Sequence, residues 1–164
     1  MRRPARTRAP YAAYWNLNTG LQTVSRNRWA IAWAVLTAAF ALHVVDEATH
    51  DFLAWYNPTA LAIRARFGGL PFPPTFTFPV WLTGLCVAVA LLAALTPLIR
   101  PGKRWPLIAS YVYAVIHIGN AMGHITVSAS GRWLAPGVLS SPFLLAASLW
   151  LLYETERARR SRRT

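Results

Sequence analysis

Acidic residues are scarce in this 164-residue chain, which has five Asp and Glu against seventeen Lys and Arg. Charged residues of both signs make up 13% of the chain and apolar residues 55%. A soluble domain needs a charged surface, and typically about a quarter of its residues are charged. The composition therefore argues against a soluble protein, and the length suffices for one domain.

Cysteine is nearly absent. Cys86 is alone, which excludes an intramolecular disulfide and a cysteine-rich metal motif. It lies within an apolar run, where we expect a small buried hydrophobic side chain. A secretory cleavage site is also missing: no small-x-small pattern follows the first apolar run, which we interpret as a retained helix.

The basic residues concentrate outside the apolar segments, with six before Trp29 and five after Glu156. A nucleic-acid-binding protein would carry its basic face on the folded core, so we expect no nucleic-acid partner. We interpret residues 1–28 and 156–164 as basic cytoplasmic tails that meet the anionic lipid headgroups of the bilayer.

Four apolar segments predict an all-α fold, an integral membrane bundle of four transmembrane helices within residues 29–155. The two middle segments have 22 and 23 residues, enough to cross a hydrocarbon core of about 30 Å. The outer two are shorter or more polar. The expected spans are residues 29–50, 78–99, 105–127 and 133–153.

The distribution of Lys and Arg between these spans predicts the orientation. The two tails and the loop between the second and third spans carry fourteen of the seventeen basic residues. Because cytoplasmic segments are enriched in Lys and Arg, both termini are expected in the cytoplasm. The chain is therefore expected to be a multi-pass protein of the cell membrane.

The longest loop, residues 51–77, is expected to contain a short surface helix over residues 57–67 and then a Gly/Pro-rich turn. Such a loop is typical both of a lid over the outer mouth of a site and of an ordinary connector. The sequence leaves these two alternatives open.

All four histidines and three of the five acidic residues fall in two short stretches. Offsets of three, four and seven residues share one helix face. The first stretch therefore forms one polar stripe of His43, Asp46, Glu47 and His50, and the second forms another of His117, Asn120 and His124.

The predicted orientation brings both stripes to the outer half of the membrane. The first helix runs outward and ends just past Glu47, and the third runs outward and ends near Val127. Gly119 and Gly123 have the small-x-x-x-small spacing that lets a neighbouring helix approach closely. We expect a polar pocket between these two helices. Ionisable groups inside a membrane cost about 2.5–3.5 kcal/mol, so they indicate function rather than only helix pairing.

At these residues the chain resembles the HXXEE-domain family of small bacterial membrane proteins. The motif that names the family appears here as His43-Val-Val-Asp46-Glu47, with Asp in place of the first Glu. The resemblance extends to Asn120-Ala-Met-Gly-His124 and to the turn over residues 132–137, and covers roughly residues 40–150. It implies a fold and a site rather than a reaction.

Three functions agree with this pattern. The first is acid/base chemistry, of an isomerase or cyclase type, on a lipophilic substrate that enters from the bilayer. In it His43 and Glu47 transfer protons beside Asp46, and His124 and Asn120 orient the substrate or the partner imidazole.

The second is a mononuclear metal site for Zn or Fe with ligands among His43, Glu47, His117 and His124. The third is not enzymatic: the chain is then a small transporter or an assembly protein whose polar cluster passes protons or joins helices. Four spans are few for an independent transporter, so this third function would require a homo-oligomer.

Overall fold

A computed structural model describes residues 11–69, 71–100, 103–131 and 135–162, with side chains from residue 28 onward. The regular structure in these ranges is helical and they contain no strand, so the all-α prediction is confirmed for them. The helices are α1 (Tyr11–Thr49), α2 (Phe52–Arg66), α3 (Phe78–Leu95), the short 3₁₀ helix η1 (Thr96–Leu98), α4 (Trp105–Ala129) and α5 (Ser141–Arg160).

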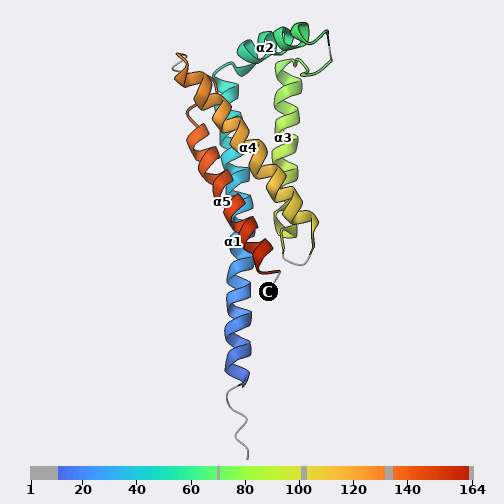
Figure 1. Cartoon of the computed structure of the whole chain (residues 1–164). Coiled ribbons are helices and arrows are strands. Elements are labelled where there is room, and N and C mark those ends of the chain that lie inside the picture. Colours follow the sequence, from blue (N-terminus) through green and yellow to red (C-terminus); the bar gives the residue numbers. More distant parts are fainter. Residues whose placement is uncertain (1–10, 70, 101–102, 132–134, 163–164) are drawn as a thin grey trace, which may run out of the picture.

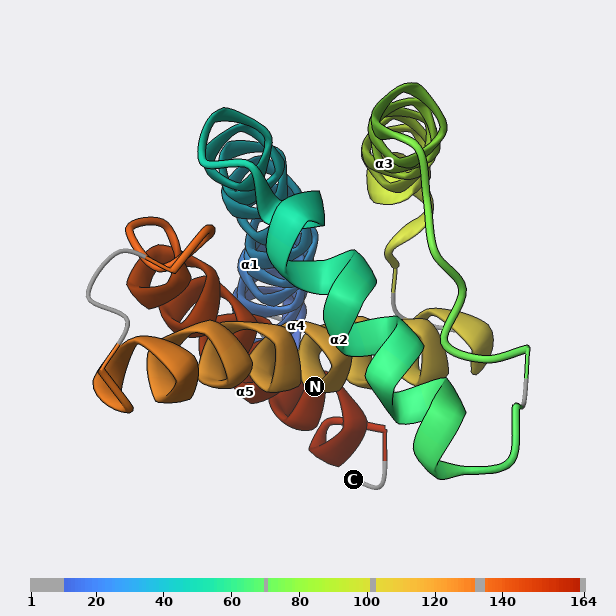
Figure 2. The same ribbon diagram turned by 90° about the horizontal axis from the view of Figure 1, so that it is seen from above.

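The helices form a bundle with a cap (Figure 1). Helices α1, α4 and α5 pack together, and α3 stands beside α1. Helix α2 lies across one end of the bundle, almost perpendicular to α1 (Figures 1 and 2). We call this the α2 end. The polar stripe of α1 reaches the α2 end because α1 stops there, at Thr49.

Large apolar side chains fill the centre of the bundle. Trp29, Trp33 and Leu36 of α1 are fully buried, as are Leu144 and Leu151 of α5. A buried indole N–H needs an acceptor. That of Trp29 lies 3.2 Å from the Ser110 hydroxyl of α4 and 3.1 Å from the Thr155 hydroxyl of α5. This contact ties the three helices together at the end opposite α2.

Helix α3 is attached more loosely. Trp81 is its buried residue, and the Trp33 indole of α1 donates to the Leu92 carbonyl of α3 at 2.9 Å. Most other side chains of α3 are exposed, including Cys86. The expectation that Cys86 is buried is wrong, because α3 presents that face away from the bundle.

Two helical segments of the described chain are long and apolar enough to cross a membrane. They are Arg28–Thr49 with 22 residues and Phe78–Leu98 with 21 residues. They coincide with the first and second expected spans. Helices α4 and α5, in the regions of the third and fourth expected spans, do not reach the same hydropathy within the described residues.

Two predicted boundaries differ from the structure, at the first helix and in the loop after it. Helix α1 begins at Tyr11, inside the segment interpreted as a tail. Helix α2 begins at Phe52, five residues before the expected surface helix. The reason is Asp51, whose left-handed φ of 53° turns the chain at once from α1 into α2.

The helix of the fourth expected span begins later than predicted. Residues 135–140 form turns, and α5 begins only at Ser141. The helix cannot include Gly137, because Gly137 adopts a φ of 82°, which an α-helix does not accommodate. The apolar run in the sequence continues through this position and therefore does not mark the helix start. Residues 132–134 of that span lie outside the described residues, as do residues 1–10 and 163–164 of the tails.

The predicted close approach at Gly119 and Gly123 is also wrong. Both glycines are exposed, and a Cβ built on either would meet nothing within 4 Å. They lie on the face of α4 that points away from α1 and α5. The helix contacts of α4 are made by other residues, among them Ala114 and Ala121, which are fully buried.

Candidate functional site

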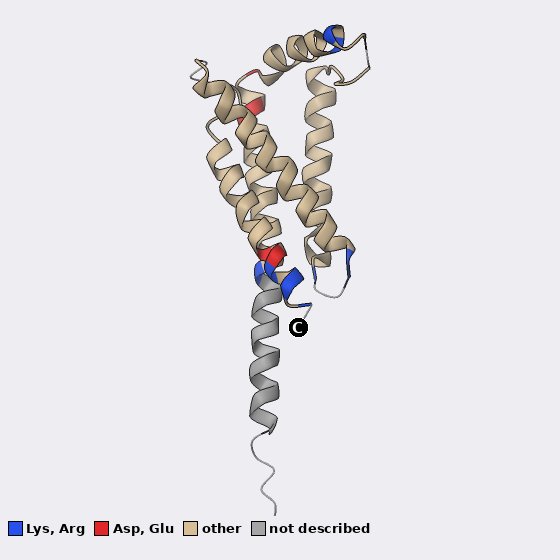
Figure 3. Ribbon diagram, viewed as in Figure 1, with Lys and Arg blue, Asp and Glu red and all other residues tan. Residues whose placement is uncertain are grey.

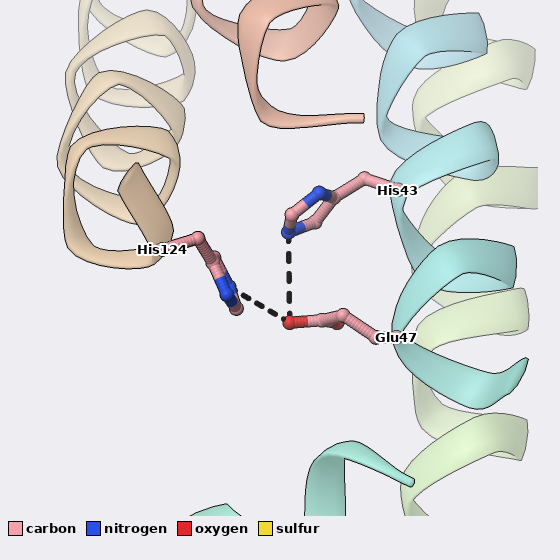
Figure 4. A group of neighbouring side chains, drawn as sticks. All are labelled: His43, Glu47 and His124. Atoms are coloured by element: carbon pink, nitrogen blue, oxygen red, sulfur yellow. Dashed lines mark ion pairs between the residues drawn. The ribbon is translucent and has the colours of Figure 1, made fainter. Parts of the chain in front are cut away.

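Two side chains of α1 and one of α4 converge at the α2 end (Figure 4). His43 and Glu47 are one helical turn apart and therefore point in the same direction. Oε1 of Glu47 lies 3.5 Å from Nε2 of His43 and 3.1 Å from Nε2 of His124. The two imidazole rings are 4.8 Å apart, edge to face. One carboxylate oxygen is thus flanked by two imidazole nitrogens from different helices.

The three residues are shielded from solvent. The exposed fractions are 0% for His43, 5% for Glu47 and 7% for His124. One nitrogen or oxygen from each residue lies within 4.8 Å of the other two. We call His43, Glu47 and His124 the three-residue cluster.

Asp46 points in a different direction from Glu47, toward the start of α5. Its Oδ2 accepts from the Ser140 backbone N–H at 2.8 Å and from the Ser140 hydroxyl at 2.7 Å. The unpaired N–H groups at a helix start favour a negative charge there. Asp46 therefore anchors α5 to α1.

The Ser140 hydroxyl also determines which nitrogen of His43 carries the proton. It lies 2.8 Å from Nδ1 of His43. A hydroxyl has one proton to donate, and the Asp46 carboxylate at 2.7 Å is the stronger acceptor. The Ser140 oxygen then accepts from His43, so we assign the proton of neutral His43 to Nδ1.

This tautomer leaves Nε2 of His43 with a lone pair directed into the cluster. Nε2 is buried and has no hydrogen-bond partner in the described part of the protein. Its nearest charged neighbour is the Glu47 carboxylate at 3.5 Å. Two electron-rich atoms facing each other in a buried site are unfavourable unless positive charge lies between them. The cluster is therefore arranged to hold a proton or a metal cation.

The backbone of Gly137 packs directly against both imidazole rings of the cluster. A Cβ at this position would lie 2.8 Å from Cε1 of His43 and 2.9 Å from Cε1 of His124. Its φ of 82° also disfavours any side chain. The turn before α5 thus brings its backbone against the cluster, which requires glycine.

Phe52, at the start of α2, lies beside His124 of the cluster. The Phe52 ring lies 5.8 Å from the ring of His124 and 5.7 Å from that of Trp81 on α3. Helix α2, which begins five residues before the expected surface helix, thus contributes Phe52 to the surroundings of the cluster.

The other candidate residues lie outside this cluster. His117 donates through Nδ1 to the Tyr113 carbonyl at 3.0 Å, and its ring packs edge-on against Phe40 and Tyr113. Asn120 is half-buried and makes no hydrogen bond within the described residues. His50 is exposed and lies 2.9 Å from Oδ1 of Asp46. Of the four proposed metal ligands, the structure thus brings His43, Glu47 and His124 together and leaves His117 apart.

Sequence reasoning missed the contributions of Ser140, Gly137 and Phe52. Ser140 carries a recognisable signal, because Ser140-Ser141-Pro142 is a typical helix start, with Ser at the cap and Pro in the first turn. No signal in one sequence connects that helix start with Asp46, 94 residues earlier.

A family model described as a protein of unknown function with HXXEE motif matches residues 33–151. The chain belongs to this family. Searches of the curated proteins and of the solved structures find no match. In this HXXEE protein the two acidic positions of the motif have separate surroundings: Asp46 contacts the start of α5, and Glu47 contacts the imidazoles. His43, the histidine of the motif, lies between these two surroundings. Its Nδ1 faces Ser140, the partner of Asp46, and its Nε2 faces Glu47.

Proposed function

We propose that this HXXEE protein is a four-span membrane enzyme that binds one metal ion through His43, Glu47 and His124 and acts on a lipophilic substrate. Both termini lie in the cytoplasm, and the α2 end, with its cluster, lies at the outer side of the cell membrane. Asp46 and Asn120, expected as catalytic residues, do not act as ligands in this proposal; Asp46 positions the site.

The distribution of apolar side chains supports four spans. Large apolar residues of α1, α3, α4 and α5 point outward, such as Val45, Leu91, Ile116 and Leu149, each at least 50% exposed. Ionisable residues such as His43 and Glu47 point inward. Water would not favour this arrangement, since soluble monomers rarely expose large apolar patches. A hydrocarbon environment favours it.

Helix α5 is the short span. Its apolar part, residues 141–153, extends about 20 Å at 1.5 Å per residue, less than a hydrocarbon core of about 30 Å. The turns before it complete the crossing, because Ala135, Gly137 and Ser140 are buried in the protein. Irregular backbone is acceptable at membrane depth where protein covers it.

The charges support the orientation (Figure 3). At the end opposite α2, Arg28 pairs with the buried Glu154 at 3.1 Å, and Arg159 and Arg160 pair with Glu156. Hydrogen bonds from Arg159 and from the Tyr111 hydroxyl hold the pKa of Glu156 well below its usual range. An excess of basic residues at this end is typical of the cytoplasmic side, where they meet anionic headgroups.

The spacing of the three ligand atoms carries the metal assignment. Imidazole and carboxylate ligands lie about 2.0–2.2 Å from zinc. Two such ligands in a tetrahedral site are therefore about 3.4 Å apart. The Glu47 oxygen lies 3.1 Å and 3.5 Å from the two imidazole nitrogens, close to this value, and all three ligand atoms lie within 4.8 Å of one another. The Nε2 lone pair of His43, which has no other partner, would be the ligand electron pair.

Two imidazoles and one carboxylate suit zinc or non-haem iron(II) and leave coordination positions open for substrate or water. An ion held in this way polarises a bound oxygen or lowers the pKa of a bound water. Phe52 and the turn at Gly137 exclude bulk water from the cluster, which strengthens these electrostatic effects.

The test is elemental analysis of the purified protein in detergent, with His124→Ala and a matched His50→Ala control. We expect near-stoichiometric zinc or iron in the wild type and in His50→Ala, and none in a folded His124→Ala protein. Wild-type protein that remains metal-free after incubation with both metals would overturn the metal assignment.

Acid/base catalysis is the second candidate, and the same cluster supports it. Glu47 sits between two imidazoles, so a proton can be exchanged between the carboxylate and His124 across 3.1 Å. In a metal-free protein, lipid conversion that Glu47→Gln abolishes would favour this candidate.

A further inference from the structure

We propose that the groove between α2 and α3 binds a single hydrocarbon chain, so that the substrate of the three-residue cluster is a single-chain amphiphile whose polar head reaches Glu47. This inference rests on the proposed function for its chemistry, whereas the binding of the chain can be measured independently.

The groove is apolar and has a volume of about 310 Å³. Aromatic and aliphatic residues line it together with Gly84, which has no side chain to fill the space. The lining residues are Phe52, Tyr56, Phe76, Val80, Trp81, Gly84 and Leu85.

The polar groups at its rim are already paired. The Tyr56 hydroxyl donates to the Pro74 carbonyl at 3.0 Å, and burial raises the pKa of Tyr56, which keeps that proton in place. The Asn57 side chain exchanges two hydrogen bonds with the Phe76 backbone. Apart from the Trp81 indole N–H, which makes no hydrogen bond within the described residues, the side chains of the lining offer a ligand no free hydrogen-bonding group, and this favours a hydrocarbon occupant over a polar one.

The groove adjoins the cluster at Phe52, which lines the groove and also contacts His124. This ring packs on Trp81 and Tyr56 on the groove side, and lies 5.8 Å from the His124 ring on the cluster side. A chain lying along Trp81 thus has its head end at Phe52, the residue that packs beside His124. The size of the groove is at the lower end of the range for small-molecule sites, roughly 300–1,000 Å³, which fits one chain rather than two.

Access from the bilayer follows from the position of α3. Val80 and Leu91 of α3 are each more than 60% exposed, so this helix presents an apolar surface next to the groove. A larger apolar groove of about 470 Å³ lies between α1 and α5, but none of its lining residues belongs to the cluster or contacts it through a ring or hydrogen bond. Of these two grooves, the one between α2 and α3 is therefore the one that contacts the cluster.

Gly84 provides the means to test this. A Cβ at Gly84 meets nothing within 4 Å, so Gly84→Phe fills the groove without a backbone clash. Gly119→Phe is the matched control, because Gly119 is also helical, exposed and free of neighbours within 4 Å. Gly84→Leu is a smaller second variant in case the phenylalanine protein does not fold.

The probe is a fatty acid carrying a photoreactive diazirine on its chain, incorporated into vesicles with the full-length protein. We expect labelling of the peptide that contains Trp81 and Gly84, reduced about tenfold by excess unlabelled oleic acid. Gly84→Phe should lose this competed labelling, and Gly119→Phe should keep it.

Labelling that oleic acid does not reduce, or that persists in both Gly84 variants, would overturn the inference. Metal content is measured in the same preparations and is expected to be unchanged by Gly84→Phe. A protein that binds the chain but no metal would therefore contradict the metal assignment alone, and one that binds metal but no chain would contradict this inference alone.

Discussion

The hydroxyl of Ser140 lies 2.8 Å from Nδ1 of His43, although 97 residues separate them in the chain. This contact connects the start of α5 with the cluster on α1 and α4. Because the same hydroxyl donates to Asp46, it fixes the neutral tautomer of His43 with Nε2 free. Groups that orient a ligating histidine in this way contribute to metal affinity without touching the metal.

Ser140→Ala is expected to lower metal affinity about 10- to 100-fold, the range found for groups behind a metal ligand. The physical reason is loss of the acceptor for the Nδ1 proton of His43. ¹⁵N chemical shifts of His43 in the metal-free protein should show the Nδ1–H form in the wild type and a mixture of tautomers in the variant. Ser148→Ala is the control, since the buried Ser148 hydroxyl donates only to its own helix, at the Leu144 carbonyl. Equal affinities and identical shifts in Ser140→Ala and wild type would refute this role.

Gly137→Ala is expected to abolish metal binding while the helices remain folded. The new Cβ would lie within 3 Å of both imidazole rings, so His43 and His124 must move apart. Gly131→Ala is the control: Gly131 also has a positive φ, 111°, but a Cβ there has no neighbour within 4 Å. Both variants carry the backbone penalty, and only Gly137→Ala should lose the metal in elemental analysis. Metal loss in both would attribute the effect to backbone strain instead.

Asp46→Asn is expected to destabilise the protein by about 1–2 kcal/mol, because a hydrogen bond to a charged acceptor contributes about 1.5–3 kcal/mol and a neutral one about 0.5–1.5 kcal/mol. The affected bonds are those from the backbone and hydroxyl of Ser140. Reversible unfolding in mixed micelles measures the change. Asp51→Asn, at an exposed position, should leave the free energy of unfolding nearly unchanged. A similar loss in both variants would mean that Asp46 does not anchor α5.

The orientation predicts opposite accessibilities for two engineered cysteines in a Cys86→Ala background. Ala65→Cys, in the exposed last turn of α2, should react with a membrane-impermeant maleimide in intact cells. Ser161→Cys, just after α5, should react only after the membrane is opened. The reverse pattern would invert the orientation. Reaction of both in intact cells would exclude the odd number of spans, α3, α4 and α5, that the proposal places between them.

The sequence predicted the helical class, and helical periodicity with the direction of the helices also predicted that residues of the two stripes meet, although only His124 of the second stripe joins His43 and Glu47. His43 and Glu47 share a face at an offset of four, and the direction of each helix decides which ends meet. The structure brings His124 to that face across 77 residues, at 3.1 Å from Glu47.

Helix periodicity did not separate Asp46 from Glu47, which are adjacent and both lie on the inner side of α1. Their partners are set by the angle at which α5 packs, and that angle depends on side chains far away in the chain. The same limit applies to Gly137. A Pro-Gly pair signals a turn, whereas contact of that turn with two imidazoles is a property of the packed bundle.

The anchoring of α5 by Asp46 has a consequence for the order of assembly. During synthesis α1, α2, α3 and α4 emerge before Ser140, so both histidines and the glutamate of the cluster are made before the group that sets the tautomer of His43. Until α5 docks, Nδ1 of His43 lacks its acceptor and Gly137 is not yet behind the rings. If the cluster binds metal as proposed, the docking of α5 would be the step that completes the site, and a protein in which α5 is not yet inserted would hold the ion less tightly.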